Sequence, residues 1–167
     1  MAPSSAEAVA RSYFDAIARR NVDDLVAHYN PEVVVEFIGQ GIYRGPDEMR
    51  EFFTGLFAAL PDGEMAVERV VGGDGVAVVE WRMRGNFTGH ELFGIEPTGR
   101  WIDQRGCDVL LVEDGLVTRN TAYQDGMEMA RSIGMMPPLD SGPERAMKQA
   151  FNLATRARRA LADRLGS

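Results

Sequence analysis

Residues 107–125, CDVLLVEDGLVTRNTAYQD, contain two apolar runs separated by the tripeptide Glu113-Asp114-Gly115. Apolar and β-branched residues on both sides of a glycine-containing turn are typical of a β-hairpin. A three-residue turn, with the glycine in the left-handed conformation, would place Asp108 opposite Asn120. Opposed residues share one face of a sheet, so this register predicts that the carboxylate and the amide lie side by side.

The face that carries this pair extends along both predicted strands. It comprises Gln104, Gly106, Asp108, Leu110, Asn120, Ala122 and Gln124. Gly106 and Ala122 would also oppose each other, and their small size leaves a hollow beside the polar pair. If this face lines a cavity, burial raises the pKa of Asp108, whereas an amide donor from Asn120 lowers it. If it is the solvated side of an antiparallel sheet, its polar residues are ordinary surface groups.

Helices dominate the chain before residue 60. A serine followed three residues later by an acid, Ser4 and Glu7, predicts a capping box at the start of the first helix. Helical spacing of apolar residues predicts two further helices, over 20–29 and 44–60. Between them, the β-branched segment 30–39 predicts a strand.

The remainder of the chain is mainly β. We predict strands over 64–72, 75–85, 99–113 and 116–125, an irregular connection over 85–99, and helices over 126–138 and 141–166. Helices followed by antiparallel strands indicate an α+β fold: a cone-shaped, strongly curved, mainly antiparallel sheet with the N-terminal helices on its concave face. We expect this domain over residues 1–137 and a C-terminal amphipathic helical extension over 138–167.

Composition argues against several classes of function. The net charge of −7 leaves no excess of cations for sequence-independent binding to nucleic acid. Cys107 is the single cysteine, so no internal disulfide is possible, and with only His28 and His90 we expect no transition-metal site. There is no apolar run of bilayer length and no secretory signal, so we expect a soluble cytoplasmic protein without membrane partners.

Three segments resemble the SnoaL-like polyketide cyclases: YFDAIARRNVDDLVAHYNPEVVVEF, GPDEMREFF and FGIEPTGR…VLLVEDGLV…D. The resemblance covers about residues 6–137. These cyclases share the nuclear-transport-factor-2 (NTF2) fold with limonene epoxide hydrolase and ketosteroid isomerase. The resemblance implies a homodimer, an apolar cavity for a small hydrophobic molecule, and no metal or organic cofactor.

The catalytic residues of these relatives are only partly kept. The histidine and aspartate of the cyclases fall on Asp108 and Ala122. The catalytic residues of the epoxide hydrolases fall on apolar positions: Trp81, Met83, Val35 and Phe37. The chain therefore lacks the water-activating groups of the epoxide hydrolases and keeps one carboxylate at the cyclase site.

The first functional hypothesis is a cofactor-independent cyclase or isomerase acting on a hydrophobic, carbonyl-bearing, polyketide-like molecule. Asp108 would be the general base and Asn120 its orienting or oxyanion partner. We expect the cavity to be lined by Phe14, Val35, Phe37, Trp81, Met83, Gln104, Leu110, Ala122, Gln124 and His90. The second hypothesis is a ligand-binding protein that has lost the family acid/base, with an epoxide hydrolase ranked below it. The third is a structural role, with dimerisation or partner contact through the last helix.

Overall fold

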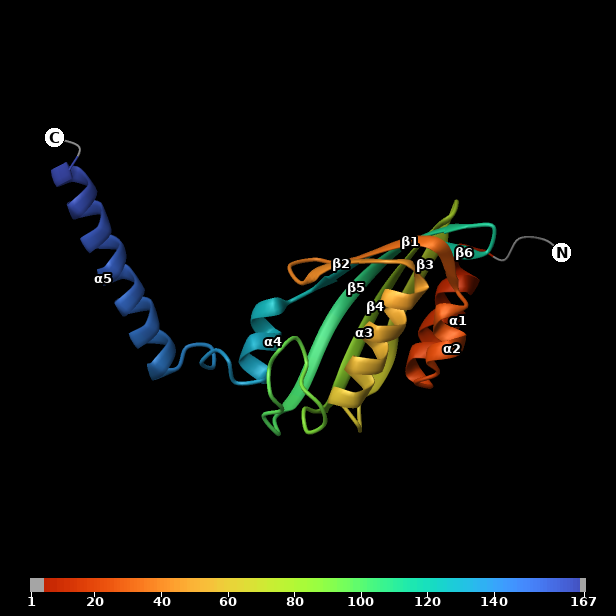
Figure 1. Ribbon diagram of the computed structural model, residues 1–167, viewed down its shortest axis with the longest axis horizontal. Coiled ribbons are helices and arrows are strands. Elements are labelled where there is room, and N and C mark those ends of the chain that lie inside the picture. The colour runs from red at the N-terminus through yellow and green to blue at the C-terminus, as the bar shows by residue number, and fades with distance from the viewer. Residues whose placement is uncertain (1–4, 166–167) are drawn as a thin grey trace.

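The computed structural model describes residues 5–165 (Figure 1). Within this range the elements are α1 (Ala6–Ala18), α2 (Val22–Val26), β1 (Tyr29–Phe37), β2 (Gly41–Arg44), α3 (Gly45–Ala59), β3 (Glu64–Gly73), β4 (Val76–Asn86), β5 (Trp101–Glu113), β6 (Leu116–Gln124), α4 (Gly126–Ser132) and α5 (Gly142–Leu165). The strands form one curved sheet in the order β2-β1-β6-β5-β4-β3. Every neighbouring pair is antiparallel except β1 and β6, which run parallel.

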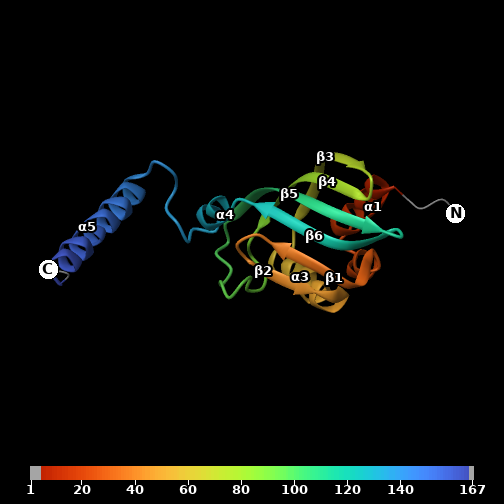
Figure 2. The same cartoon turned by 90° about the horizontal axis from the view of Figure 1, so that it is seen from above.

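The predicted fold class is confirmed. Helices α1, α2 and α3 lie together on the concave side of the sheet (Figures 1 and 2). The predicted elements all form, and the structure adds the short edge strand β2, which was not predicted from the sequence. This strand pairs with the end of β1, from Val34 opposite Arg44 to Phe37 opposite Gly41.

The first helix begins one residue later than the predicted capping box requires. Ser4 lies outside the described residues, so that half of the prediction has no structural counterpart. The N-cap is Ser5, whose hydroxyl accepts a hydrogen bond from the Ala8 N–H at 3.2 Å. Glu7 instead pairs with Arg11 one turn later, at 2.8 Å.

The core fills the space between the helices and the sheet. Tyr13 and Phe14 of α1, Met49 of α3, and Leu110 of β5 are almost completely buried. Each such side chain stabilises the fold by about 1.5–3 kcal/mol. Because α1 and α3 pack these residues against the concave face of the sheet, the polar groups on that face are buried under the helices as well.

The turn between β5 and β6 is shorter than predicted. Asp114 and Gly115 form a two-residue turn with φ values of +50° and +80°, and Glu113 pairs with Leu116. Asp-Gly with both φ values positive is the favoured sequence for a two-residue hairpin, because its twist matches that of the strands. The predicted three-residue turn is therefore wrong.

A bulge then changes the register once more. Thr118 has no opposite residue on β5, and beyond it Asp108 pairs with Ala122. The predicted pairs Asp108–Asn120 and Gly106–Ala122 are wrong, because the short turn and the bulge together shift the register by two residues. Side chains alternate between faces with a period of two, so the same residues still share one face.

The C-terminal helix α5 extends away from the sheet and its helices (Figures 1 and 2). Its first turn is joined to α4 by Glu144, which is 1% exposed and pairs with Arg131 at 3.0 Å. Its larger apolar side chains are exposed: Met147, Phe151, Leu153 and Leu161. None of the helices between residues 5 and 165 is both long enough and apolar enough to cross a bilayer.

Candidate functional site

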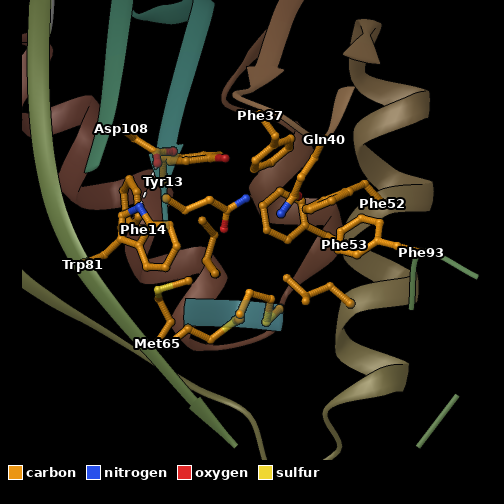
Figure 3. Close-up of a pocket in the computed structure, with 15 residues that line it drawn as sticks. Tyr13, Phe14, Phe37, Gln40, Phe52, Phe53, Met65, Trp81, Phe93 and Asp108 are labelled. Carbon is orange, nitrogen blue, oxygen red and sulfur yellow. Dashed lines mark hydrogen bonds between the residues drawn. The ribbon is translucent and has the colours of Figure 1, made fainter. Parts of the chain in front are cut away.

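The concave face of the sheet and helices α1 and α3 enclose a pocket of about 40 Å³ (Figure 3). Figure 3 shows Asp108, Tyr13 and Trp81 at one end of this pocket and Phe52 and Phe93 at the other. The lining residues are Tyr13, Phe14, Ile17, Phe37, Gln40, Phe52, Phe53, Leu56, Met65, Trp81, Met83, Phe93, Asp108, Gln124 and Met129. The pocket is therefore an apolar, aromatic-rich space with a single carboxylate in its wall.

Asp108 is held by a hydrogen bond to each of its carboxylate oxygens. It is 5% exposed, and its Oδ1 accepts from the Trp81 indole N–H at 2.7 Å. Its Oδ2 accepts from the Asn120 side-chain N–H, also at 2.7 Å. The predicted contact between Asp108 and Asn120 therefore forms, diagonally across the strands, although the predicted register was wrong. Each oxygen retains accepting capacity for a further proton donor.

Burial raises the pKa of Asp108 from 3.8 to about 6, and hydrogen bonds from Asn120 and Trp81 oppose this rise. Both effects have simple causes, because an apolar wall disfavours the charged carboxylate while N–H donors stabilise it. At neutral pH the group is mainly ionised, yet it is a stronger base than a carboxylate on the surface. Such a pKa suits a group that takes up and releases protons near neutrality.

Gly106 makes room for the tryptophan that binds the carboxylate. Trp81 on β4 pairs with Gly106 on β5, and a Cβ at position 106 would lie 2.1 Å from the Trp81 ring. The predicted hollow beside Gly106 is therefore filled by the indole. Because the ring occupies this space, its N–H reaches Asp108.

A buried pair of tyrosine hydroxyls lies beside the carboxylate. The hydroxyl oxygens of Tyr13 and Tyr29 are 2.6 Å apart. Burial and the charge of Asp108 raise the pKa of Tyr13, while hydrogen bonds from Tyr29 and Asn120 oppose this rise. Both phenols therefore stay protonated at neutral pH, and Tyr13 brings an O–H group to the pocket wall. The sequence pattern does not predict this pair, because Tyr13 follows the helical spacing of core residues.

Two buried amide oxygens next to this network lack a partner. Among the described residues, no hydrogen bond reaches Asn120 Oδ1 or Gln104 Oε1. The Gln104 amide nitrogen donates to backbone oxygens of Arg105 and Asp125. Asn120 and Gln104 are fully buried and do not line the pocket, so these two oxygens are a cost to the fold, because an unpaired acceptor is unfavourable to bury.

The predicted lining residues are placed in three ways. Of these residues, Phe14, Phe37, Trp81, Met83 and Gln124 line the pocket with Asp108. Val35, Gln104, Leu110 and Ala122 are fully buried in the sheet instead of lining the pocket. His90 is exposed and is not among the residues that line this pocket.

The aromatic half of the pocket comes from α3 and was not predicted as part of the site. Phe52 stacks on Phe37 with ring centroids 4.5 Å apart, and it meets Phe53 edge to face. The sequence pattern placed Phe52 and Phe53 on the apolar side of the helix. That pattern cannot distinguish a residue packed in the core from one that faces an enclosed space.

Comparison with known proteins places these features in a family. A model of the SnoaL-like domain matches residues 10–120. No curated protein sequence matches the chain.

Solved structures share its fold. A candidate SnoaL-like polyketide cyclase from Jannaschia sp. CCS1 is 23% identical, with a TM-score of 0.68, over 77% of this chain and 91% of that one. An epoxide hydrolase from M. tuberculosis, similar to limonene epoxide hydrolase, is 18% identical with a TM-score of 0.62, over 77% and 88%. An NTF2-like protein from Burkholderia thailandensis is 17% identical with a TM-score of 0.68, over 80% and 99%. The predicted NTF2-like fold is confirmed.

Proposed function

The chain belongs to the SnoaL-like domain family, and we propose from this premise that it is a cofactor-independent cyclase or isomerase. Its substrate would be a hydrophobic, carbonyl-bearing small molecule of the polyketide kind. Asp108 carries the proposal, because it is a carboxylate with a pKa of about 6 in the wall of an otherwise apolar pocket. A buried group with a perturbed pKa in such a pocket is characteristic of a catalytic acid or base.

The proposed reaction begins with proton transfer to Asp108. Its carboxylate takes a proton from the carbon next to the substrate carbonyl, and the C–H electron pair moves into an enolate. The Tyr13 hydroxyl and the Gln124 amide, which also line the pocket, supply donors for the enolate oxygen. Asn120 holds the carboxylate in position.

Two outcomes complete the reaction without any further reagent. In an isomerase, Asp108 returns the proton to a different carbon of the conjugated system, and the double bond moves. In a cyclase, the enolate carbon attacks a second carbonyl of the same molecule, and the proton is passed to the new alkoxide. The structure of the substrate decides between these outcomes, because the first step is the same in both.

The second candidate is a ligand-binding protein without catalysis. Ala122, which is fully buried, lies where the cyclases carry their aspartate, so the chain has no second carboxylate at this site. The epoxide-hydrolase reaction ranks below both, since apolar residues such as Trp81 and Met83 lie where its charged groups would be.

Deuterium exchange distinguishes the two candidates. The probe is 2-tetralone, an aromatic ketone, incubated with the protein in heavy water while NMR follows loss of its α-hydrogens. We expect the wild-type protein to accelerate the exchange, with a rate that rises with pH through about 6. Asp108→Asn should abolish the acceleration, whereas Asp74→Asn, in the turn before β4, should not change it.

Binding is measured in the same variants through Trp81. A Trp101→Phe background removes the second indole, which is 53% exposed at the start of β5. Quenching of Trp81 by the ketone then reports occupancy of the pocket independently of turnover. If the ketone quenches Trp81 but wild-type protein and Asp108→Asn exchange its hydrogens equally slowly, the binding candidate replaces the catalytic one.

A further inference from the structure

A second chamber of about 330 Å³ adjoins the pocket. It lies between α4 and the irregular connection that follows β4, and it shares Gln40, Phe93 and Met129 with the pocket that contains Asp108. The other large residues of its wall are apolar: Phe87, Leu92, Ile95, Ala130, Ile133 and Met135. Gln40 is the only polar residue among those that line it in the described part of the chain.

The inner pocket is too small for the proposed ligand by itself. Its volume is only about 40 Å³. Sites for small molecules have volumes of about 300–1,000 Å³. A hydrophobic ligand whose carbonyl reaches Asp108 must therefore extend beyond the inner pocket, and the shared residues lead into the outer chamber.

Phe93 lines both chambers and lies in a strained turn. Phe93 and Gly94 form a two-residue turn with φ values of +54° and +73°, closed by two hydrogen bonds of 3.0 Å between Leu92 and Ile95. The left-handed region is unfavourable for a bulky residue with a Cβ. The Phe93 ring is 49% exposed, and its centroid lies 6.2 Å from that of Phe52 at the outer end of the pocket (Figure 3).

This combination is not explained by core packing, because a half-exposed ring contributes little to the core and its backbone is strained. Strained backbone persists where the surrounding structure imposes it, and such positions gather at binding sites and at moving segments. Phe93 lines both chambers, so a different orientation of its ring would alter the boundary between them.

We propose that the outer chamber is a binding subsite for the apolar tail of the ligand, with Phe93 controlling the passage between tail and head. The ligand class is an uncharged, elongated amphiphile: a carbonyl-bearing head that reaches Asp108, and a hydrocarbon or aromatic tail that lies against α4. The inference rests on the proposed ligand site, but it does not require catalysis, since a non-catalytic ligand would occupy the same two chambers.

Two ketone probes that differ only in their tails test the subsite. They are 4′-methylacetophenone and 4′-octylacetophenone, and binding is measured by quenching of Trp81 in the Trp101→Phe background. We expect the octyl probe to bind at least about tenfold more tightly, because its additional methylene groups leave water for the outer chamber.

Met135→Lys tests whether the octyl tail lies in the outer chamber. Met135 lines the outer chamber and is 65% exposed, so a lysine there adds a charge without disturbing the core. We expect it to weaken binding of the octyl probe severalfold and to leave the methyl probe unchanged. Met147→Lys, at an exposed methionine of α5 outside the chamber, is the matched control and should change neither probe.

Phe93→Gly tests the passage. Glycine suits the left-handed backbone and removes the ring, so a wider head such as that of 2-acetylnaphthalene should bind more tightly than to the wild-type protein. Equal affinity for the two tails, or equal loss of both probes in Met135→Lys, would refute the subsite. Tail-dependent binding without deuterium exchange would refute the catalytic proposal alone, and failure of every probe to bind would refute the ligand site itself.

Discussion

The buried carboxylate should make the protein less stable as the pH rises. Asp108 in the unfolded chain ionises near its ordinary pKa of 3.8, whereas in the folded chain it keeps its proton up to about pH 6. Below pH 3.8 both states are protonated and the group contributes nothing to the pH dependence. Above about pH 6 the folded chain contains a buried charge that the unfolded chain solvates freely, so the folded state is disfavoured.

The size of the effect follows from the two pKa values. Each unit of difference corresponds to about 1.4 kcal/mol, so the contribution of Asp108 to the unfolding free energy falls by about 3 kcal/mol in total, and about 2 kcal/mol of this is lost between pH 4 and pH 6. Asp62 and Asp103 behave in the opposite sense, because hydrogen bonds from Asn86 and Arg82 lower their pKa values. Their contributions are lost as the pH falls, and they mask that of Asp108 in a measurement on the wild-type protein alone.

A comparison with Asp108→Asn removes this masking. Urea denaturation of both proteins from about pH 4 to about pH 8 gives two stability curves whose difference isolates residue 108. Asparagine adds an offset that does not depend on pH, so we expect the variant to gain about 2.5 kcal/mol on the wild type across the interval. Asp74→Asn should follow the wild-type curve. A difference between wild type and Asp108→Asn that stays constant with pH would refute the raised pKa.

Three further substitutions test how the site and its scaffold are held. Gly106→Ala places a Cβ 2.1 Å from the Trp81 ring, so we expect the fluorescence emission of Trp81 to change. Gly55→Ala is the control: no atom lies within 4 Å of its added Cβ, and it should stabilise α3 by about 1 kcal/mol. Asp125→Ala removes the side chain that accepts from two N–H groups at the start of α4 and should lower the unfolding free energy by about 1 kcal/mol in urea. Arg20→Met removes the donor to the backbone oxygens of Phe57, Leu60 and Gly63, of which that of Leu60 keeps the Gly63 N–H, and this should cost about 2 kcal/mol in the same assay.

Each of these substitutions has a contrary result. Unchanged Trp81 emission in Gly106→Ala would mean that the added Cβ does not displace the indole, which contradicts the predicted overlap. Wild-type stability in Asp125→Ala or Arg20→Met would mean that water replaces the lost hydrogen bonds without cost.

The hairpin illustrates what the sequence could and could not predict. The alternation of polar and apolar residues determines which side chains share a face, so Asp108 and Asn120 were correctly placed together. The pairing itself depends on the length of the turn and on the bulge at Thr118, which are local choices that alternation does not encode. Two offsets of one residue happened to add to an even shift, and only for that reason did the predicted face survive.

The remaining omissions have two causes. Trp81 and Tyr13 were read as apolar residues, yet each has an apolar body and a polar tip that forms a hydrogen bond in the site. A hydrophobicity pattern reflects the apolar ring of such a side chain and gives no information about its polar N–H or O–H group. Phe93 and His90 lie in an irregular connection, where no periodicity predicts which side chain turns inward.

Gly106 limits how far this sequence can diverge. Any other residue there overlaps the indole of Trp81 on the neighbouring strand, and a smaller residue at position 81 would remove the N–H that binds Asp108. Neither position can therefore change alone without altering the proton affinity of the carboxylate. In proteins that descend from a common ancestor with this chain and keep its site, we expect positions 81 and 106 to be inherited as a pair.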